Sequence, residues 1–326
     1  MIVPKFWAEA RLQEQREKRR FTIRRYGWSD VSEEDAQRVA EERAREAMAR
    51  AIAGEPIERR EKKTSYGVEG VPIREEVVAW HGESVVTRNI YGARCLNTPS
   101  AFFIDVDFRS DLGRAGCLSF FVGFAAPFVV LFWYLPFWKA LAAALPVAFG
   151  ALIVGGICAV VVSKFVMALR GGAERVARKR IETYFARREL WRWRLYRTPF
   201  GYRVLVIHRP FDPEETEVDE TFKALGADPL YALMCRKQRC FRARVSPKPW
   251  RIGVGRILPR NNVWPIRPEG MAARRAWVEN YERVAEGYAA CRFDGEFGEG
   301  IPDSAVVAVQ RLHDQLCKAE SGLPIA

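Results

Sequence analysis

The chain has 326 residues, of which 49% are hydrophobic and 28% charged, and its formal net charge is +12. This composition is typical of a folded protein, and it excludes a disordered tail, a collagen and a coiled-coil rod. The seven cysteines are scattered and include no C-x-x-C pair, so no disulfide framework is expected and a reducing compartment is predicted. The three histidines show no zinc-type spacing to these cysteines, and we therefore expect no zinc site.

The first part of the chain, residues 1–60, is predicted to be a helical segment. It becomes charged at once, which is not typical of a signal peptide. Residues 6–20 predict a polar helix. A second helix is predicted from Glu33 to Ala53, because Ser32 and Asp35 form an S-x-x-D capping box and Gly54 follows the last turn.

Residues 61–116 change to a pattern rich in Val, Ile, Phe and Thr. Three strands are predicted, at residues 73–80, 84–90 and 101–108, separated by turn residues at 81–82 and 97–100. We interpret this region as the first β-rich half of a cytoplasmic domain.

Residues 117–169 are almost free of charge. Uncharged runs of 21 and 24 residues, Leu118–Trp138 and Ala140–Ser163, are separated only by Lys139, and each is long enough to cross a bilayer as a helix. The alternative is a buried helical hairpin in a soluble core, but neither run has the polar stripe of such a helix. We therefore predict a transmembrane hairpin in which Gly150, Gly155 and Gly156 allow close helix approach.

The flanks of this hairpin predict its orientation. Basic residues precede it and a larger group follows it, whereas the turn between the two runs offers only Lys139. By the positive-inside rule, both termini are expected to be cytoplasmic and the hairpin to lie in the inner, cytoplasmic membrane.

Residues 170–268 are predicted to form the second, basic half of the same domain. The pattern indicates a helix at 173–189, strands at 191–197 and 202–208 joined by a T-P-F-G turn, a short helix ending at Gly226, a helix opened by Asp228 and Pro229, and a strand at 240–245. Residues 269–326 return to helix, at about 270–290 and 303–319. The predicted fold class is an α+β cytoplasmic domain with an inserted two-helix transmembrane hairpin and helical N- and C-terminal segments.

Two carboxylates in FFIDVDF form the first candidate site. Asp105 and Asp107 are two residues apart on a predicted strand, so both project from one face. Such a pair needs a compensating cation, and its hard oxygen ligands suit Mg²⁺ or Mn²⁺ bound together with substrate phosphates. The alternative is a strand-end pair that is exposed to solvent or paired with arginine.

The second candidate is a basic stretch. Between Pro229 and Pro268 there are ten Lys or Arg and no acid, with aromatic residues interleaved. We predict that four of these residues bind phosphate: Arg242, Arg244, Lys248 and Arg251. The phosphate could belong to an anionic lipid, a nucleotide or a nucleic acid, and these sources stay open at this point.

His208, at the end of the predicted strand YRVLVIH, is the candidate catalytic residue, although a strand-end histidine is more often structural. Together with Asp105, Asp107 and the Thr198 to Gly201 turn, it resembles the catalytic core of the archaeo-eukaryotic primase-polymerase superfamily. That resemblance implies a D-x-D pair that binds divalent metal, a histidine that contacts the nucleotide phosphates, and a third acidic residue, for which Asp294 is the candidate.

Three further segments, RYGWSD, RNIYGARCLNTP and FRARVSPKPWR, are similar to segments of bacterial membrane proteins without an assigned activity. This similarity implies no function.

Two functional hypotheses follow from the sequence. The chain is either a membrane-anchored, metal-dependent nucleotidyltransferase-like protein or a non-catalytic membrane-anchored scaffold whose basic face binds anionic lipid or nucleic acid. A D-x-D glycosyltransferase is disfavoured because the nucleotide-binding βαβ units that should precede its D-x-D are not predicted. The sequence also contains no G-x-S-x-G, P-loop or Rossmann glycine pattern.

Overall fold

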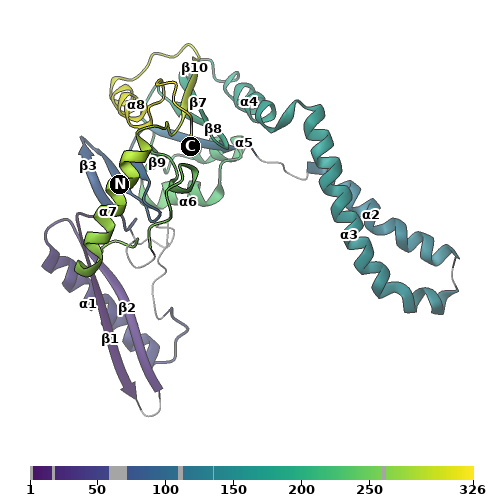
Figure 1. Ribbon diagram of the computed structural model, residues 1–326, viewed down its shortest axis with the longest axis horizontal. Coiled ribbons are helices and arrows are strands. Elements are labelled where there is room, and N and C mark those ends of the chain that lie inside the picture. Colours follow the sequence, from purple (N-terminus) through teal and green to yellow (C-terminus); the bar gives the residue numbers. More distant parts are fainter. Residues whose placement is uncertain (1–2, 17–18, 59–71, 109–112, 135, 259–261) are drawn as a thin grey trace. The chain divides into compact units, whose positions relative to one another are not determined.

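A computed structural model describes residues 3–16, 19–58, 72–108, 113–134, 136–258 and 262–326. Figure 1 shows its helices and strands in chain order. The strands are β1 (Phe6–Arg16), β2 (Arg19–Ser29), β3 (Glu76–His81), β4 (Ser84–Arg88), β5 (Arg94–Thr98), β6 (Phe102–Asp107), β7 (Trp193–Thr198), β8 (Gly201–Val206), β9 (Phe241–Arg244) and β10 (Arg292–Phe297). The helices are α1 (Glu33–Ile52), α2 (Gly113–Tyr134), α3 (Phe137–Leu169), α4 (Gly172–Phe185), α5 (Thr216–Leu225), α6 (Pro229–Gln238), α7 (Pro268–Ala285) and α8 (Ser304–Cys317), with a short 3₁₀ turn at Pro249–Arg251.

The chain divides into two compact units, and we describe each separately. The first contains Met1–Val106, Phe185–Pro199 and Arg203–Ala326, and the second contains Asp107–Tyr184 and Phe200–Tyr202. The described strands form three sheets, with the orders β1-β2, β10-β7-β8-β6 and β3-β4-β5-β9. Strands from before and after the apolar helices therefore share two of the sheets, as the sequence predicted, and the α+β class is confirmed.

The N-terminal segment is not the polar helix that we predicted for residues 6–20. It is the first strand of an antiparallel hairpin in which Phe6 pairs with Ser29 and Leu12 with Ile23. The prediction was wrong because the apolar residues follow a period of two. Ala8, Ala10 and Leu12 lie on one face and pack against α1. The alternate residues Arg11, Gln13 and Gln15 are exposed to solvent.

Helix α1 confirms the predicted helix and its capping box. Ser32 is the N-cap, and its side chain accepts a hydrogen bond from the backbone N–H of Asp35 at 3.1 Å. The helix buries an alanine stripe, made of Ala36, Ala40 and Ala44, against the hairpin. A Cβ added at Gly27 would overlap the carbonyl oxygen of Ala36 and the backbone nitrogen of Ala40, so glycine is required for this close approach.

Strand β6 is buried on both faces, because successive side chains point to opposite sides of a strand. On one face, Phe102 contacts Phe222 of α5 and Phe241 of β9, with ring centroids 5.2 and 5.0 Å apart. On the other face, the ring centroid of Phe103 lies 5.0 Å from that of His313 in α8. Asp105 belongs to the same face as Phe103, so the face that carries this carboxylate also meets α8.

Most of the remaining predicted elements are confirmed, including the helix that ends at Gly226, whose backbone is left-handed, and the N-cap and N1 pair of Asp228 and Pro229. Strands β5 and β10 were missed. We interpreted residues 97–100 as a turn, but the central strand β5 ends only at Thr98, where it pairs with Phe241 of β9. The C-terminal segment is accordingly two helices with an edge strand between them.

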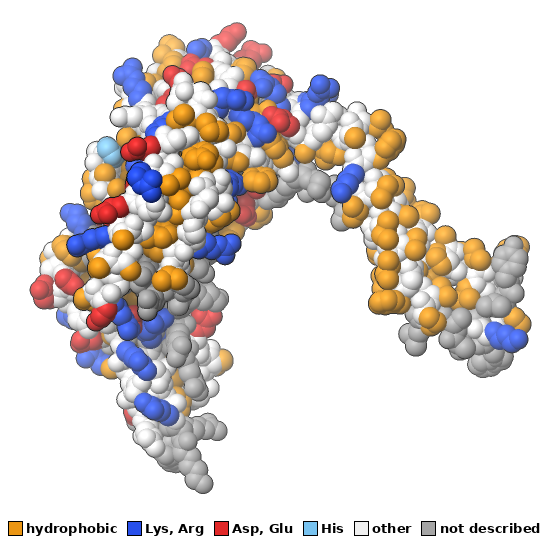
Figure 2. Space-filling model, viewed as in Figure 1, with side chains coloured by type: hydrophobic (Ala, Val, Ile, Leu, Met, Phe, Trp, Pro, Cys, Tyr) orange, Lys and Arg blue, Asp and Glu red, His pale blue; other side chains and the backbone are white. Residues whose placement is uncertain are grey.

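The second unit holds the long apolar helices α2 and α3. They pack at Gly123 and Gly155, since a Cβ at Gly123 would lie 3.0 Å from the Gly155 Cα. Gly155 therefore has the predicted role, whereas nothing lies within 4 Å of a Cβ added at Gly150 or Gly156. Figure 2 shows hydrophobic side chains over most of the visible surface of these two helices.

Helix α3 contains one segment, Pro146–Leu169, that is long and apolar enough to cross a membrane, judged by length and composition: it has 24 residues and includes an 18-residue stretch with a mean hydropathy of 2.4. Little of this segment is buried within the protein. The apolar part of α2, Cys117–Trp133, is shorter than the roughly 20 residues of a typical span. The structure therefore supports one candidate span, and the second span of the predicted hairpin stays a prediction.

Candidate functional site

Asp105 lies in an ion pair, the alternative that the sequence had left open. The guanidinium of Arg203, on β8, donates from Nε to Asp105 Oδ1 at 2.7 Å and from Nη2 to Oδ2 at 3.0 Å. The Arg203 side chain is 3% exposed and that of Asp105 is 45% exposed. Burial alone would raise the pKa of Asp105, but the charge and hydrogen bonds of Arg203 outweigh it and lower the pKa.

The structure places the other two acids of the predicted metal site on two different strands. Asp107 is the exposed last residue of β6, and Asp294 is an exposed residue of β10. Strands β6 and β10 are opposite edges of the four-stranded sheet. Since neighbouring strands are about 4.8 Å apart, three steps separate β10 from β6 by roughly 14 Å, so Asp294 is too far away to share a metal with Asp105 and Asp107. The Asp105 and Asp107 metal pair itself stays a prediction.

His208 lies in aromatic packing. Its ring centroid is 5.0 Å from that of Trp191 and 5.5 Å from that of Phe211. Burial, and then the charge of Arg209, lower its pKa, so the ring is neutral at pH 7. Within the described part of the chain its Nδ1 is buried and has no hydrogen-bond partner. This environment suits a structural ring better than a group that contacts nucleotide phosphates.

The predicted phosphate-binding residues have different surroundings. Arg242 is buried, and its Nη2 donates to both carboxylate oxygens of Glu75, at 2.7 and 2.6 Å, while Nη1 donates to Asn97 Oδ1 at 3.0 Å. Arg244 donates to the carbonyl oxygen of Ser246 at 2.8 Å. Arg242 is therefore a structural residue of the β5 and β9 pair.

The remaining two lie near a partly exposed aromatic side chain. Lys248 and Arg251 are half-buried, and the Lys248 ammonium lies 5.5 Å from the ring centre of Trp250, whose side chain is exposed. Burial, followed by the nearby charge of Arg244, lowers the pKa of Arg251. These two residues stay the candidates for contact with an anion.

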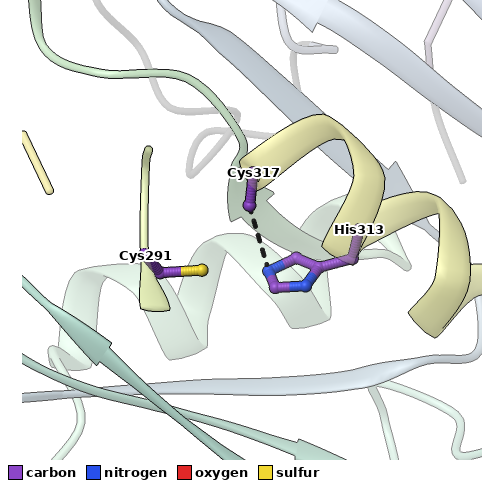
Figure 3. Close-up of side chains that lie close together, drawn as sticks. All are labelled: Cys291, His313 and Cys317. Carbon is purple, nitrogen blue, oxygen red and sulfur yellow. Dashed lines mark hydrogen bonds between the residues drawn. The ribbon is translucent and has the colours of Figure 1, made fainter. Parts of the chain in front are cut away.

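A cluster that the sequence analysis did not predict lies beside Arg203. Cys291, His313 and Cys317 are fully buried, and their ligand atoms all lie within 4.8 Å of one another. Figure 3 shows Cys291 approaching the imidazole from one side and Cys317 contacting it from α8, with 3.4 Å between Cys317 Sγ and His313 Nε2. His313 Nδ1 is 3.0 Å from Asp314 Oδ1.

The side chains of Cys291, His313 and Cys317 shift one another's pKa values. A hydrogen bond from Cys317 lowers the pKa of Cys291, an effect that burial opposes and that the charge of His313 reinforces. Burial raises the pKa of Cys317. Burial alone would lower the pKa of His313, but Cys291 and Asp314 outweigh it and raise the pKa. Cys291 is therefore the cysteine of this cluster that forms a thiolate most readily.

The sequence contained a signal for this cluster. His313 and Cys317 are four residues apart, which places them on one face of a helix, and this H-x-x-x-C spacing was overlooked when we expected no zinc-type arrangement. Cys291 is 22 positions from His313, and only the packing of α8 against the sheet brings it close. Arg203 was also missed, although an arginine within the apolar run YRVLV is a signal for a buried ion pair.

The first unit also contains a pocket of about 650 Å³. It is lined by residues that include Trp7, Glu33, Trp264 and Met271. None of the predicted site residues is among those that line it. Comparisons with known protein families, with curated proteins and with solved structures find no match for this chain.

Proposed function

We propose that the protein is a non-catalytic, membrane-anchored binding protein, in which the α2 and α3 hairpin is the anchor and the α+β unit is the binding part. The observation that carries this proposal is the outward-facing apolar surface of the two helices. Large side chains on both are exposed, including Phe121 at 66% and Val129 at 65% on α2, and Ile153 at 50% and Ile157 at 58% on α3. A continuous apolar surface of this kind is stable when lipid covers it.

The chemistry of the predicted active site favours binding over catalysis. Asp105 is neutralised by Arg203, and His208 packs against aromatic rings. Nucleotidyltransfer needs free carboxylates that hold a divalent metal and a group that reaches the substrate phosphates. Lys248 and Arg251 are the residues through which the α+β unit would contact an anionic headgroup or a nucleic acid backbone.

Cell fractionation tests the anchor. The full-length protein should stay with the membrane fraction after alkaline carbonate extraction and be released only by detergent. Replacing Ile153 and Ile157 together by Lys should shift most of the protein out of the carbonate-resistant fraction, because each charge costs about 3 kcal/mol at the centre of a membrane helix. Leu230→Lys, at an exposed position of α6 in the other unit, is the matched control and should stay in the membrane. Release of the unchanged protein from the membrane fraction by carbonate alone would contradict the proposal.

Nucleotide binding tests the competing hypothesis. Detergent-purified protein should bind a nucleoside triphosphate with Mn²⁺ no better than the double variant Asp105→Asn with Asp107→Asn. A clear loss of Mn²⁺-dependent binding in the variant would instead support the nucleotidyltransferase-like hypothesis.

A further inference from the structure

The buried Cys291, His313 and Cys317 cluster brings three possible metal-ligand atoms within 4.8 Å of one another. Helix α8 supplies His313 and Cys317 from successive turns, and Cys291 enters from the residue that precedes β10. With zinc bonds of about 2.05 Å to nitrogen and 2.3 Å to sulfur, a tetrahedral site places these two donor atoms about 3.6 Å apart. The observed distance from His313 Nε2 to Cys317 Sγ is 3.4 Å. We propose that Cys291, His313 and Cys317 bind a zinc ion that fastens α8 to the start of β10.

The second nitrogen of His313 supports this assignment. Its Nδ1 faces the Asp314 carboxylate at 3.0 Å, and Asp314 is itself held by Gln310 Nε2 at 2.5 Å and by Arg194 at 3.2 Å. A carboxylate that accepts the Nδ1 proton fixes the tautomer in which the Nε2 lone pair faces the two sulfur atoms. The same carboxylate and histidine arrangement orients the imidazole ligands of zinc proteins.

The charged groups beside the cluster have partners other than the metal ligands. Arg203 pairs with Asp105, and Asp314 pairs with Arg194, which also forms ion pairs with Glu296 and Glu320. Two cysteine thiolates then match the two positive charges of zinc, so the loaded site adds no net charge to the protein interior. Arg203 Nη1 lies 3.3 Å from His313 Nε2 and also donates to the carbonyl oxygen of Arg244 at 2.9 Å, a bond that holds the guanidinium when a metal takes the nitrogen lone pair.

Burial of all three ligands assigns the ion a structural role, because a substrate in solution cannot reach it. Among the described residues three side chains supply ligands, and a small fourth ligand such as water completes the tetrahedron. The zinc proposal is independent of the membrane anchor, since the cluster lies entirely in the first unit.

Metal content and cobalt substitution test the proposal. Full-length protein, purified in detergent with a reductant, should contain one zinc per chain. Cobalt in place of zinc should give the near-ultraviolet charge-transfer absorption of a thiolate-bound Co²⁺ ion. Cys317→Ser and His313→Gln should each lower the zinc affinity at least tenfold and remove or weaken that absorption. The matched control is Cys240→Ser, at a buried cysteine outside the cluster, which should keep both the zinc and the absorption.

Cysteine alkylation of the unchanged protein tests the zinc proposal even if the variants do not fold. Zinc should protect Cys291 and Cys317 from alkylation, and a chelator should raise the alkylation rate of these two cysteines relative to Cys235. Absence of both zinc and the cobalt absorption in the reduced protein would overturn the proposal, as would a disulfide between Cys291 and Cys317 in protein that was never reduced. Full zinc content in both ligand variants would also overturn it.

Discussion

Buried arginines account for part of the basic character of this chain. Arg88, Arg203, Arg242 and Arg274 are all buried, at 6%, 2%, 9% and 3% exposure. Each is close to a carboxylate from another part of the sequence, such as Glu76 for Arg274 at 2.6 Å. A count of charges from the sequence cannot distinguish these residues from a solvated basic face, because their partners are far away along the chain. Arg242, which we predicted to bind phosphate, is the clearest case.

The Asp105 and Arg203 pair should contribute to stability in a pH-dependent way. Asp105→Asn should lower the free energy of unfolding by about 2 kcal/mol at pH 7, less than for a fully buried pair because the carboxylate is partly exposed. The folded state holds the pKa of Asp105 below its usual value of 3.8. The contribution is therefore present above that value and is lost as the pH falls through the folded pKa.

Urea unfolding of the detergent-purified protein, followed by tryptophan fluorescence, measures this effect. The difference between the unchanged protein and Asp105→Asn should shrink between about pH 5 and pH 3. Asp219→Asn is the control, because Asp219 pairs with Lys223 at a solvent-exposed i,i+4 position and should change stability by less than about 0.5 kcal/mol. A difference that is constant over this pH range would show that Asp105 does not act through its charge.

The helix and hairpin at the N-terminus depend on one glycine. Gly27→Val should lower the free energy of unfolding by about 3 kcal/mol, since the added atoms overlap the backbone of α1 and force it away from β2. Hydrogen exchange should show the loss of protection in α1. Gly255→Val is the control, because nothing lies within 4 Å of a Cβ at that position. Equal protection of α1 in both variants would contradict the packing described here.

The contact between α2 and α3 can be tested with a cysteine that the chain already has. A Cβ at Gly123 would lie 3.7 Å from the Cys158 Cβ, close to the mean separation of about 3.8 Å in disulfides. Gly123→Cys should therefore form a disulfide with Cys158 on mild oxidation, detected by peptide mapping. Gly156→Cys, on the open side of α3, should form none with α2. Failure of Gly123→Cys to cross-link would mean that the helices do not cross at Gly123.

Local sequence patterns predicted helix starts and ends well, because these depend on a few neighbouring residues. The cap at Ser32, the left-handed Gly226 and the pair of Asp228 and Pro229 each use short-range backbone chemistry, and all three are observed. The N-terminal hairpin was missed because residues 6–20 are polar enough for an exposed helix, and only the alanines on every second residue indicate a strand. Arg203 and the Cys291, His313 and Cys317 cluster were missed for a different reason: Arg203 meets Asp105, and Cys291 meets His313, only through tertiary packing.

At the scale of the whole molecule, the apolar helices interrupt a folded domain. Two sheets take strands from both sides of this interruption, and Asn97 of β5 is paired with Arg242 of β9. The sequence analysis had assigned the β-rich patterns before and after the apolar runs to two halves of one domain. The balance of charge and hydrophobicity over the full chain, in contrast, indicated neither the long apolar helices nor the buried arginine pairs.

The pairing of β5 with β9 also means that β5 must wait for its partner strand during synthesis. Ribosomes add about 5 to 20 residues per second, so about 7 to 30 s pass between the emergence of the two strands. Over that interval β5 has an unpaired edge beside β4, which is a template for association with other chains. The two apolar helices are made in the same interval. Early capture of α2 and α3 by a membrane would hold the unfinished sheet at a surface and keep its open edge away from other nascent chains.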